Sequence, residues 1–376
     1  MQEQAIQEIQ SILGPAFQLD ARSRLRKSLV FRSEIGQVSD SEISSIIAEL
    51  LKRGFFPRIY QTGQEYLLSV STIPESSLKS RLWLHILLFL LTIFSTMMAG
   101  AGLLQKDYFS DFRNILYGWK YSFAILCILS VHEFGHYFAA RYHRIKATLP
   151  YYLPLPLPGF HFGTLGAFIR LRSPIPDRPA LLDVGAAGPL AGFLASLIFL
   201  AIGYDQLPDL QGIIAFVETM HPWDMKEGGI NIVLGKSLLF AFFNDILSDG
   251  RLPMNEIYHF PFLFAGWIGL LITSINLIPI GQLDGGHILY ALVGKKSRLV
   301  GISAFILLIL LNVVLILGYF SFIWVLWVIL IFFIIGFRHP PTLDDHLALS
   351  GQRTTAGWFC LFLFILCFPP LPLYIN

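Results

Sequence analysis

Two histidines four residues apart lie in one apolar segment of this chain, with a glutamate between them. The segment ends Ser130-Val-His-Glu-Phe-Gly-His136, so His132, Glu133 and His136 form an HExxH pattern. On an α-helix, residues i and i+4 share one face about 6 Å apart, and two imidazoles there can bind one Zn²⁺. Glu133 follows the first histidine and can reach a water at the metal. Unpaired His and Glu are costly inside an apolar run and are normally functional there, which favours a metal site over a chance match.

A catalytic zinc site needs a third protein ligand and an open position for water, and Asp284 is the best candidate for that ligand. It lies in Asn276-Leu-Ile-Pro-Ile-Gly-Gln-Leu-Asp-Gly-Gly286, just after a later apolar segment. Pro279 and Gly281 break the helical pattern there, and irregular backbone at membrane depth is tolerated only inside protein or beside a wet cavity. Two alternatives stay open. Asp284 could cap the short helix that follows, and His287 could be the third ligand instead.

The composition places these residues in a membrane protein. The chain has 376 residues, of which 55% are hydrophobic and only 14% are charged, whereas soluble proteins carry about a quarter charged residues. The apolar residues come in long runs, and about seven of these are long enough to span a membrane. The runs lie near residues 82–104, 116–140, 184–203, 261–280, 299–318, 320–337 and 356–374. The predicted fold is therefore mainly α, with a polytopic transmembrane helix bundle over residues 81–376 in contact with the lipid bilayer. The net charge of +2 is too small to indicate nucleic acid as a partner.

Residues 1–80 are predicted to form a small soluble α+β domain. Ser39 to Arg53 has helical spacing of apolar residues behind a plausible cap. Phe55–Tyr60 and Tyr66–Val70 flank Gln61-Thr62-Gly63-Gln64, which predicts a hairpin. None of these residues indicates catalysis.

The distribution of Lys and Arg predicts the orientation in the membrane. If residues 1–80 are cytoplasmic, then segments 141–183, 281–298 and 338–355 lie on the same side, and they hold most of the Lys and Arg residues near the spans. The N-terminal sequence MQEQAIQEIQ lacks the features of a signal or transit peptide. These features predict a multi-pass protein of the bacterial cytoplasmic (inner) membrane with a cytoplasmic N-terminus.

The stretch from Leu149 to Leu182 is too rich in proline to span the membrane. Tyr151–Pro158 would be extended and Gly163–Arg172 has β character, which predicts a membrane-associated loop or β-hairpin beside the site. A helical peptide bond is shielded by its own hydrogen bonds, so an open strand edge could hold an unwound substrate segment. A purely structural re-entrant loop is the alternative. The candidate substrate-binding residues are Gly163, Thr164, Leu165, Gly166 and Asn276. For Asn276, packing of a polar helix face is the alternative role.

The paired motifs resemble those of the site-2 protease family, and most of all its cyanobacterial and plastid branch. The resemblance rests on HEFGH in a transmembrane segment and on the later Asn-x-x-Pro-x-x-x-x-Asp-Gly-Gly, and it covers about residues 82–340. Phe162-Gly-Thr-Leu-Gly-Ala and Gly185-Ala-Ala-Gly-Pro-Leu-Ala-Gly192 are also similar to that family. The resemblance implies a three-helix catalytic core, Zn²⁺ held by the two histidines and the aspartate, and cleavage of transmembrane substrates. From the residues themselves, the glycines of the 185–192 segment are predicted to serve close helix packing.

The function predicted is that of an intramembrane zinc metalloendopeptidase, with Glu133 moving protons and single-span or other membrane proteins as substrates. One alternative is another membrane zinc hydrolase, such as a prenyl-protein protease, against which the Asn276–Gly286 motif argues. A second is a membrane scaffold or pseudoprotease that binds without cutting, against which the intact Glu133 argues. A third is a metal transporter, which would need polar residues along a whole path through the membrane. The sequence leaves the oligomeric state and the identity of the substrate open.

Overall fold

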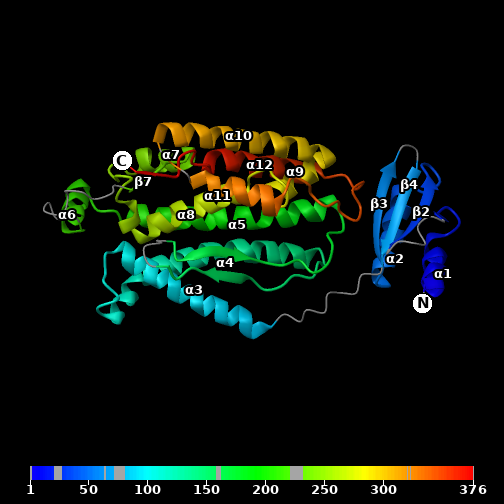
Figure 1. Ribbon diagram of the computed structural model, residues 1–376, viewed down its shortest axis with the longest axis horizontal. Coiled ribbons are helices and arrows are strands. Elements are labelled where there is room, and N and C mark those ends of the chain that lie inside the picture. The colour runs from blue at the N-terminus through cyan, green and yellow to red at the C-terminus, as the bar shows by residue number, and fades with distance from the viewer. Residues whose placement is uncertain are drawn as a thin grey trace.

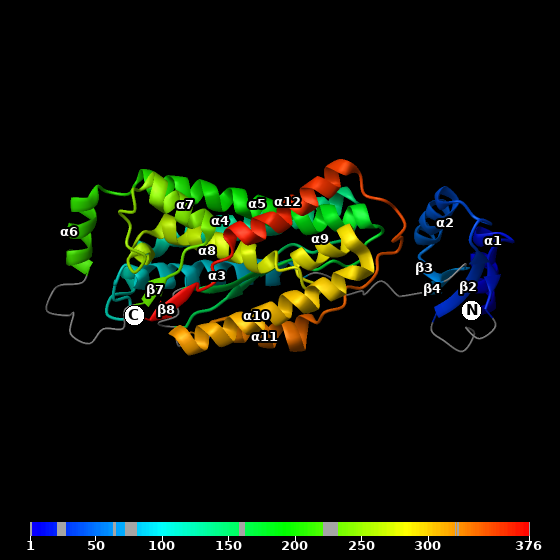
Figure 2. The same ribbon diagram turned by 90° about the horizontal axis from the view of Figure 1, so that it is seen from above.

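The computed structural model describes residues 2–20, 28–62, 65–71, 81–157, 162–220, 232–319, 321 and 323–375. Figure 1 shows a small N-terminal unit at one end of an elongated bundle of helices, and Figure 2 shows the same arrangement from above. The predicted fold class, a mainly α membrane protein with a small sheet region, is confirmed.

The N-terminal unit is a four-stranded antiparallel sheet with two helices. Its elements are α1 (Gln2–Leu13), β1 (Gln18–Leu19), β2 (Ser28–Glu34), α2 (Asp40–Lys52), β3 (Phe56–Thr62) and β4 (Glu65–Ser71), with strand order β1-β2-β4-β3. Helix α2 begins with a capping box between Ser39 and Glu42. Alternate residues of the strands, such as Ile59 and Leu68, are buried in the core. The predicted helix and strand pair are confirmed, and the turn at residues 63–64 lies outside the described residues.

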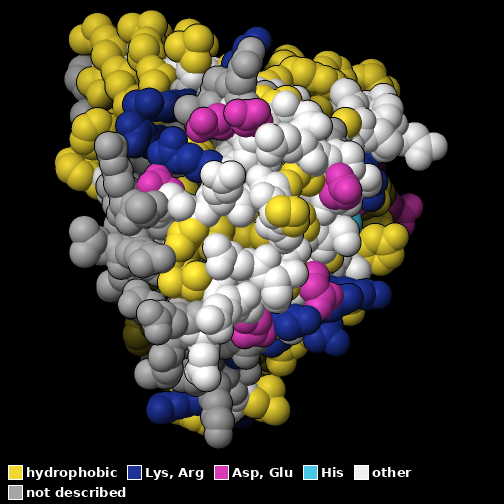
Figure 3. Space-filling view, turned by 90° about the vertical axis from the view of Figure 1, so that its right-hand side faces the viewer, with side chains coloured by type: hydrophobic (Ala, Val, Ile, Leu, Met, Phe, Trp, Pro, Cys, Tyr) yellow, Lys and Arg dark blue, Asp and Glu magenta, His cyan; other side chains and the backbone are white. Residues whose placement is uncertain are grey.

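The surface of this unit is polar. Exposed ion pairs join Arg32 to Asp20 and Arg53 to Glu49 and Glu8. Figure 3 faces this end of the molecule and shows Lys, Arg, Asp and Glu side chains spread over it. In contrast, the helices of the bundle expose large apolar side chains such as Leu307 and Leu317 of α10.

The bundle contains most of the predicted membrane segments as helices. Its main helices are α3 (Leu82–Leu103), η2 (Phe112–Gly118), α4 (Trp119–Tyr142), α5 (Arg178–Asp205), α8 (Pro261–Asn276), α9 (Asp284–Val293), η5 (Gly294–Lys296), α10 (Ser297–Tyr319), α11 (Ile323–Leu330), the π-helix η6 (Ile331–Ile335) and α12 (Gly351–Cys367). Among the described residues, four helical stretches are long and apolar enough to cross a membrane: 82–103, 112–142, 178–205 and 284–319.

The remaining three expected segments form shorter helices. Helix α8 has 16 residues, α11 has 8 before it runs into η6, and α12 has 17. Gly336, with φ of +69°, ends η6, and Pro369 and Pro370 follow α12 without extending it. The expected span at 356–374 therefore begins earlier, at Gly351, and ends at Cys367.

Short elements at the end of the bundle away from the N-terminal unit complete the chain (Figure 1). They are α6 (Leu210–Met220), β7 (Ile232–Leu234), α7 (Leu238–Leu247), η4 (Ile257–His259) and β8 (Leu373–Ile375). Strand β8 pairs with β7, which brings the C-terminus back to this end.

Helices α4, α5 and α8 pack against one another in the middle of the bundle. Buried Tyr121 and Ile125 of α4 lie in the same apolar core as Leu263 of α8. A Cβ on Gly269 of α8 would lie 2.1 Å from Ser196 Oγ of α5, so the two helices approach each other closely at this glycine. Small residues at helix contacts commonly allow such close packing in membrane proteins.

The proline-rich stretch forms the predicted hairpin. Strand β5 (Tyr151–Pro154) pairs antiparallel with β6 (Thr164–Phe168), and the tip at residues 158–161 is outside the described part. Tyr152 Oη lies 2.7 Å from Ser130 Oγ of α4, and His85 Nδ1 of α3 lies 3.0 Å from the carbonyl oxygen of Pro150. These bonds hold the hairpin against α3 and α4, next to the HExxH segment.

Candidate metal centre

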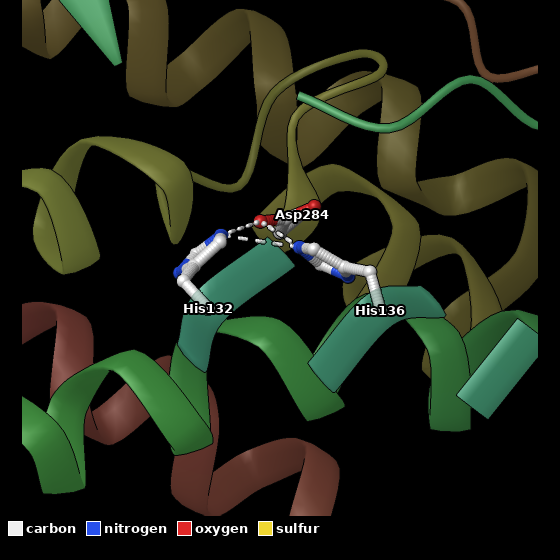
Figure 4. A group of neighbouring side chains, drawn as sticks. All are labelled: His132, His136 and Asp284. Atoms are coloured by element: carbon white, nitrogen blue, oxygen red, sulfur yellow. Dashed lines mark hydrogen bonds and ion pairs between the residues drawn. The ribbon is translucent and has the colours of Figure 1, made fainter. Parts of the chain in front are cut away.

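Three of the predicted residues converge inside the bundle. The Nε2 atoms of His132 and His136 are 3.1 Å apart, and Asp284 Oδ2 lies 3.5 Å from the first and 3.2 Å from the second. Figure 4 shows the two imidazoles of α4 and the carboxylate at the start of α9 turned toward one another. Both histidines are buried, at 3% and 7% exposure. Residues more than 140 positions apart in the chain thus form one compact donor cluster.

The spacing of these donor atoms fits a tetrahedral metal ion. Zinc binds imidazole nitrogen and carboxylate oxygen at about 2.0–2.2 Å, which in a tetrahedron separates the donor atoms by roughly 3.3–3.6 Å. The observed separations, between 3.1 and 3.5 Å, lie close to this range. Two imidazoles and one carboxylate are also the donor types of catalytic zinc sites, which keep a fourth position open. The residues present therefore fit a zinc ion, with His132, His136 and Asp284 to hold it.

One of the two imidazoles of α4, that of His136, is held in a defined tautomer. The Nδ1–H of His136 donates a hydrogen bond to the carbonyl oxygen of Val184 on α5, 2.7 Å away. This bond fixes the tautomer and leaves the Nε2 lone pair free to bind a metal. The role of Val184 could not be foreseen, because a backbone carbonyl has no signature in the sequence.

Helix α5 lies directly against both imidazoles through glycines. A Cβ on Gly188 would lie 2.1 Å from His136 Nε2, and one on Gly192 would lie 2.9 Å from His132 Nδ1. This Gly-rich segment was expected to serve close helix packing. That expectation was incomplete, because the histidine rings of α4 occupy part of the space left by the missing side chains of these glycines. The spacing of Gly185, Gly188 and Gly192 on one helical face was the signal that could have shown it.

Asp284 is positioned by a break between two helices. Helix α8 ends at Asn276, and α9 begins at Asp284 itself, with Leu283 at the N-cap and no side-chain cap. Cβ atoms on Gly285 and Gly286 would lie 2.1 and 2.4 Å from the carbonyl oxygens of Leu277 and Gly281. The Asp-Gly-Gly sequence is thus required because the first turn of α9 lies against the preceding backbone. The carboxylate is directed to the histidines.

The two alternative interpretations are not supported. Asp284 lies within the first turn of α9 and is not its N-cap residue. His287 directs Nδ1 to His339 Nε2, 2.5 Å away. Among the described residues, the cluster of converging metal-binding side chains comprises His132, His136 and Asp284 and does not include His287.

Glu133 lies beside the cluster, buried at 6% exposure. Its Oε1 is 4.0 Å from His132 Nε2, and its carboxylate accepts a hydrogen bond from the backbone of Ile169, just after β6. Asn276, predicted to contact substrate, places Nδ2 3.2 Å from His132 Nε2. A carboxylate and an amide therefore flank the donor cluster.

The predicted substrate-binding residues of the hairpin are placed in different environments. Gly163, with φ of +70°, packs so closely on α3 that a Cβ would lie 2.7 Å from the carbonyl oxygen of Ser95. Thr164 Oγ1 donates to the carbonyl oxygen of Leu153 across the hairpin at 2.9 Å, whereas Leu165 is 66% exposed. Gly166, with φ of +104°, has open space beside it. The hairpin residue that contacts Glu133 is Ile169, which the sequence did not single out.

Comparisons with known proteins point to one family. A family model described as Peptidase family M50 matches residues 120–318, which include the whole donor cluster and all of α4 but its first residue. The chain is 33% identical over 291 residues to the probable zinc metalloprotease EGY2, chloroplastic, of Oryza sativa subsp. indica, covering 75% of this chain and 49% of that protein. It is 32% identical over 290 residues to EGY2 of Arabidopsis thaliana, with 75% and 48% covered.

The chain is also 29% identical over 252 residues to the probable zinc metalloprotease EGY1, chloroplastic, of Arabidopsis thaliana, covering 60% of this chain and 43% of that protein. It spans about half the length of the curated relatives it matches. No solved structure matches the chain.

Proposed function

The chain belongs to peptidase family M50, and on that premise we propose that it is a zinc metalloendopeptidase that cleaves membrane proteins within or near their transmembrane segments. The resemblance to the plastid type of site-2 protease is confirmed, and with it the predicted class of zinc metallopeptidase at the level of the family. One observation carries the proposal: a buried His-His-Asp cluster with a glutamate and an amide beside it.

Zn²⁺ held by His132, His136 and Asp284 would supply Lewis acidity, which polarises a scissile carbonyl and makes a nearby water more acidic. Glu133 takes the proton of the attacking water and returns it to the leaving amine. Its position beside His132 and its hydrogen bond from Ile169 orient the carboxylate for that transfer. Asn276 donates from Nδ2 to the oxygen on which negative charge develops, which stabilises the transition state.

The β5–β6 hairpin is proposed to hold the substrate. A peptide bond in a helix is protected by its own hydrogen bonds, so a substrate segment must be extended before it is cut. Strand β6 runs up to Ile169, which contacts Glu133, and an extended segment along the hairpin would therefore lead to the proton-transferring carboxylate. Leu165 and Gly166 are the accessible members of the predicted set, whereas Gly163 and Thr164 serve to hold the hairpin in place.

We also propose that residues 1–80 form a soluble domain and that residues 81–376 form the membrane domain. Leu343, from the Arg-containing segment 338–355, packs into the core of the N-terminal unit. This supports an orientation in which both face the same compartment. The relatives are named as chloroplastic, so the comparisons do not support the bacterial cytoplasmic membrane predicted from the N-terminus.

A single substitution tests the proposal. Glu133→Gln keeps the size of the side chain but removes a useful base. We expect normal zinc content and cleavage of a single-span substrate reduced by about 10²–10⁴-fold. Zinc and cleavage are measured on the same preparation, with Glu218→Gln, an exposed glutamate of α6, as the matched control. Cleavage at the wild-type rate by the zinc-loaded variant would exclude Glu133 as the base. A wild-type protein that binds but never cuts a broad panel of membrane proteins would favour the scaffold alternative.

A further inference from the structure

We infer that residues 339–346, here called the strap, connect the N-terminal unit to the metal centre and position Asp284 through α9. The strap lies between η6 and α12, far from the donor cluster in the sequence. It contacts three parts of the molecule: the sheet of the N-terminal unit, the segment just before α5, and one face of α9. The inference rests on the proposed function in so far as the positioned residue is a zinc ligand.

The N-terminal unit holds the strap by its core and by a sheet edge. Leu343 is 2% exposed and belongs to the apolar core of that unit. Strand β3 is the last strand of the sheet, and the N–H of its Ile59 donates to the carbonyl oxygen of Leu343 at 3.4 Å. Ser44 Oγ of α2 donates to Asp344 Oδ2 at 3.2 Å. The strap thus covers a free sheet edge that would otherwise be open to another strand.

On its other side the strap is bonded to the segment just before α5. The N–H groups of Leu343 and Asp344 donate to the carbonyl oxygens of Ile175 and Pro176 at 3.1 and 2.7 Å. Asp177, the next residue, caps α5 by accepting from the N–H of Ala180. Helix α5 then presents Val184 and Gly188 to His136. The sheet of the N-terminal unit is therefore linked through the strap to the helix that orients one histidine ligand.

The strap also holds the face of α9 that follows Asp284. Tyr290 Oη donates to Asp345 Oδ2 at 2.6 Å. The ring of His339 stacks on Tyr290 with centroids 4.4 Å apart, and its Nε2 lies 2.5 Å from His287 Nδ1. His287 and Tyr290 are three residues apart and share one face of α9, within about two turns of Asp284. Polar contacts from the strap therefore act on α9 within two turns of the ligand.

Helix α9 needs such external support. It has ten residues, no side-chain cap and a non-helical segment before it, and Gly294, with φ of +61°, separates its direction from that of η5 and α10. Helices of this length are marginal by themselves, so tertiary contacts determine where it lies. A ligand displaced by about 1 Å loses much of its effect on catalysis. The N-terminal unit therefore affects the position of Asp284 when it docks on the strap. A partner that displaced this unit would change the metal centre in the same way.

The test releases the strap from the N-terminal unit without touching the site. Leu343→Asp places a charge in the core of that unit, Leu343→Met keeps an apolar side chain of similar volume, and Leu347→Asp is a control at a 45% exposed position of the same loop. Amide hydrogen exchange of the full-length protein is followed for residues 284–293 and, as an internal reference, for α4. Zinc transfer to a chelator is measured on the same samples.

We expect Leu343→Asp to increase exchange in residues 284–293 and to speed zinc loss by about 10-fold or more, as is typical when support of a ligand is removed. Leu343→Met and Leu347→Asp should behave as wild type, and α4 should keep its protection in all variants. Tyr290→Phe, which removes one hydrogen bond and leaves the N-terminal unit docked, should show a smaller effect in the same direction. This variant decides the matter if Leu343→Asp does not fold.

The inference would be overturned if hydrogen exchange and the rate of zinc loss in Tyr290→Phe and in a folded Leu343→Asp equalled those of the wild type. The strap would then only connect the N-terminal unit to the bundle. Neither measurement uses a substrate. If the chain never cleaves peptide bonds, the proposed function is refuted, but the exchange and zinc measurements can still be interpreted. If the strap variants behave as wild type, the inference fails, but cleavage by the wild-type protein still supports the proposed function.

Discussion

The histidine half of the candidate metal centre and its aspartate half are built in different ways. His132 and His136 lie on one helix of 24 residues, α4, whose geometry alone brings both imidazoles to one face. Asp284 is the first residue of a helix of ten residues that follows a non-helical segment. Its position depends on contacts with backbone, with α5 and with the strap. The geometry of one helix thus sets the positions of the two histidines, whereas contacts between distant parts of the chain set the position of Asp284.

The two halves should therefore fail for different reasons. The histidine half depends on the small side-chain volume of α5 at Gly188 and Gly192, because the imidazoles lie directly against these glycines. The aspartate half depends on polar contacts that hold a short helix in place. Substitutions that change volume and substitutions that remove polar contacts can separate the two.

The largest effect is expected from removal of the histidines. The double variant His132→Ala, His136→Ala should lose the one Zn²⁺ per chain that the site can bind and should show only background cleavage, because both nitrogen donors are gone. Metal analysis of the purified protein measures this. Full retention of zinc in the double variant would place the metal elsewhere.

Asp284→Ala should come next. It leaves two nitrogen donors, so zinc binding should weaken and hydrolysis should be lost. His287→Ala should keep most of both, since His287 contacts His339 and lies outside the donor cluster. Zinc affinity by chelator competition and cleavage of a single-span substrate are compared for the pair. The opposite ranking of the two variants would transfer the ligand role to His287.

A test of the volume argument is Gly188→Ala. Its Cβ would lie 2.1 Å from His136 Nε2, with the rigid backbone of α5 behind it. Overpacking costs about 1–3 kcal/mol, which corresponds to a loss of zinc affinity of roughly 5- to 150-fold. Gly318→Ala on α10, where a Cβ meets nothing within 4 Å, is the matched control. Equal zinc affinity in the two variants would show that α5 does not constrain the imidazole.

The smallest effect should appear on acidification, in the contacts that hold α9 in the aspartate half. Burial, and secondarily the neighbouring His287, lowers the pKa of His339 to about 3, against about 6.5 for an unperturbed histidine. Between these values the unfolded segment binds more protons, so the stability of the strap on α9 falls as the pH drops below about 6.5. The groups that face His339 are His287, Tyr290 and Asp345.

Hydrogen exchange at pH 7 and pH 5 measures this effect. Protection of residues 284–293 should decrease at pH 5 in the wild type and less so in His339→Gln, which cannot gain a charge. The amides of α4 serve as the reference and should not respond. An equal decrease in both proteins would assign the acid sensitivity to another group.

Much of the architecture was predictable because it depends on local patterns. Helical spacing behind a plausible cap at Ser39 predicted α2, and the turn signal at residues 61–64 predicted β3 and β4. The prolines after Tyr151 and the β character of Gly163–Arg172 predicted a loop or hairpin where a span could not form. The long apolar runs predicted helices, but three of them are shorter than expected. The break before Asp284 was predicted from Pro279 and Gly281, whereas the end of η6 at Gly336 was not, because hydropathy does not report it.

The sequence by itself determined the chemistry of the site. The spacing of His132, Glu133 and His136 places three side chains of set types on neighbouring positions of one helix, and the Asn276–Gly286 motif supplies an aspartate after a helix break. Only the tertiary structure decided that Asp284 rather than His287 joins the cluster, that Val184 and Gly188 shape the histidine side, and that the strap links this centre to the N-terminal unit. The physical reason is distance along the chain: helix geometry relates residues four apart, whereas contacts between residues more than a hundred apart exist only once the helices have packed.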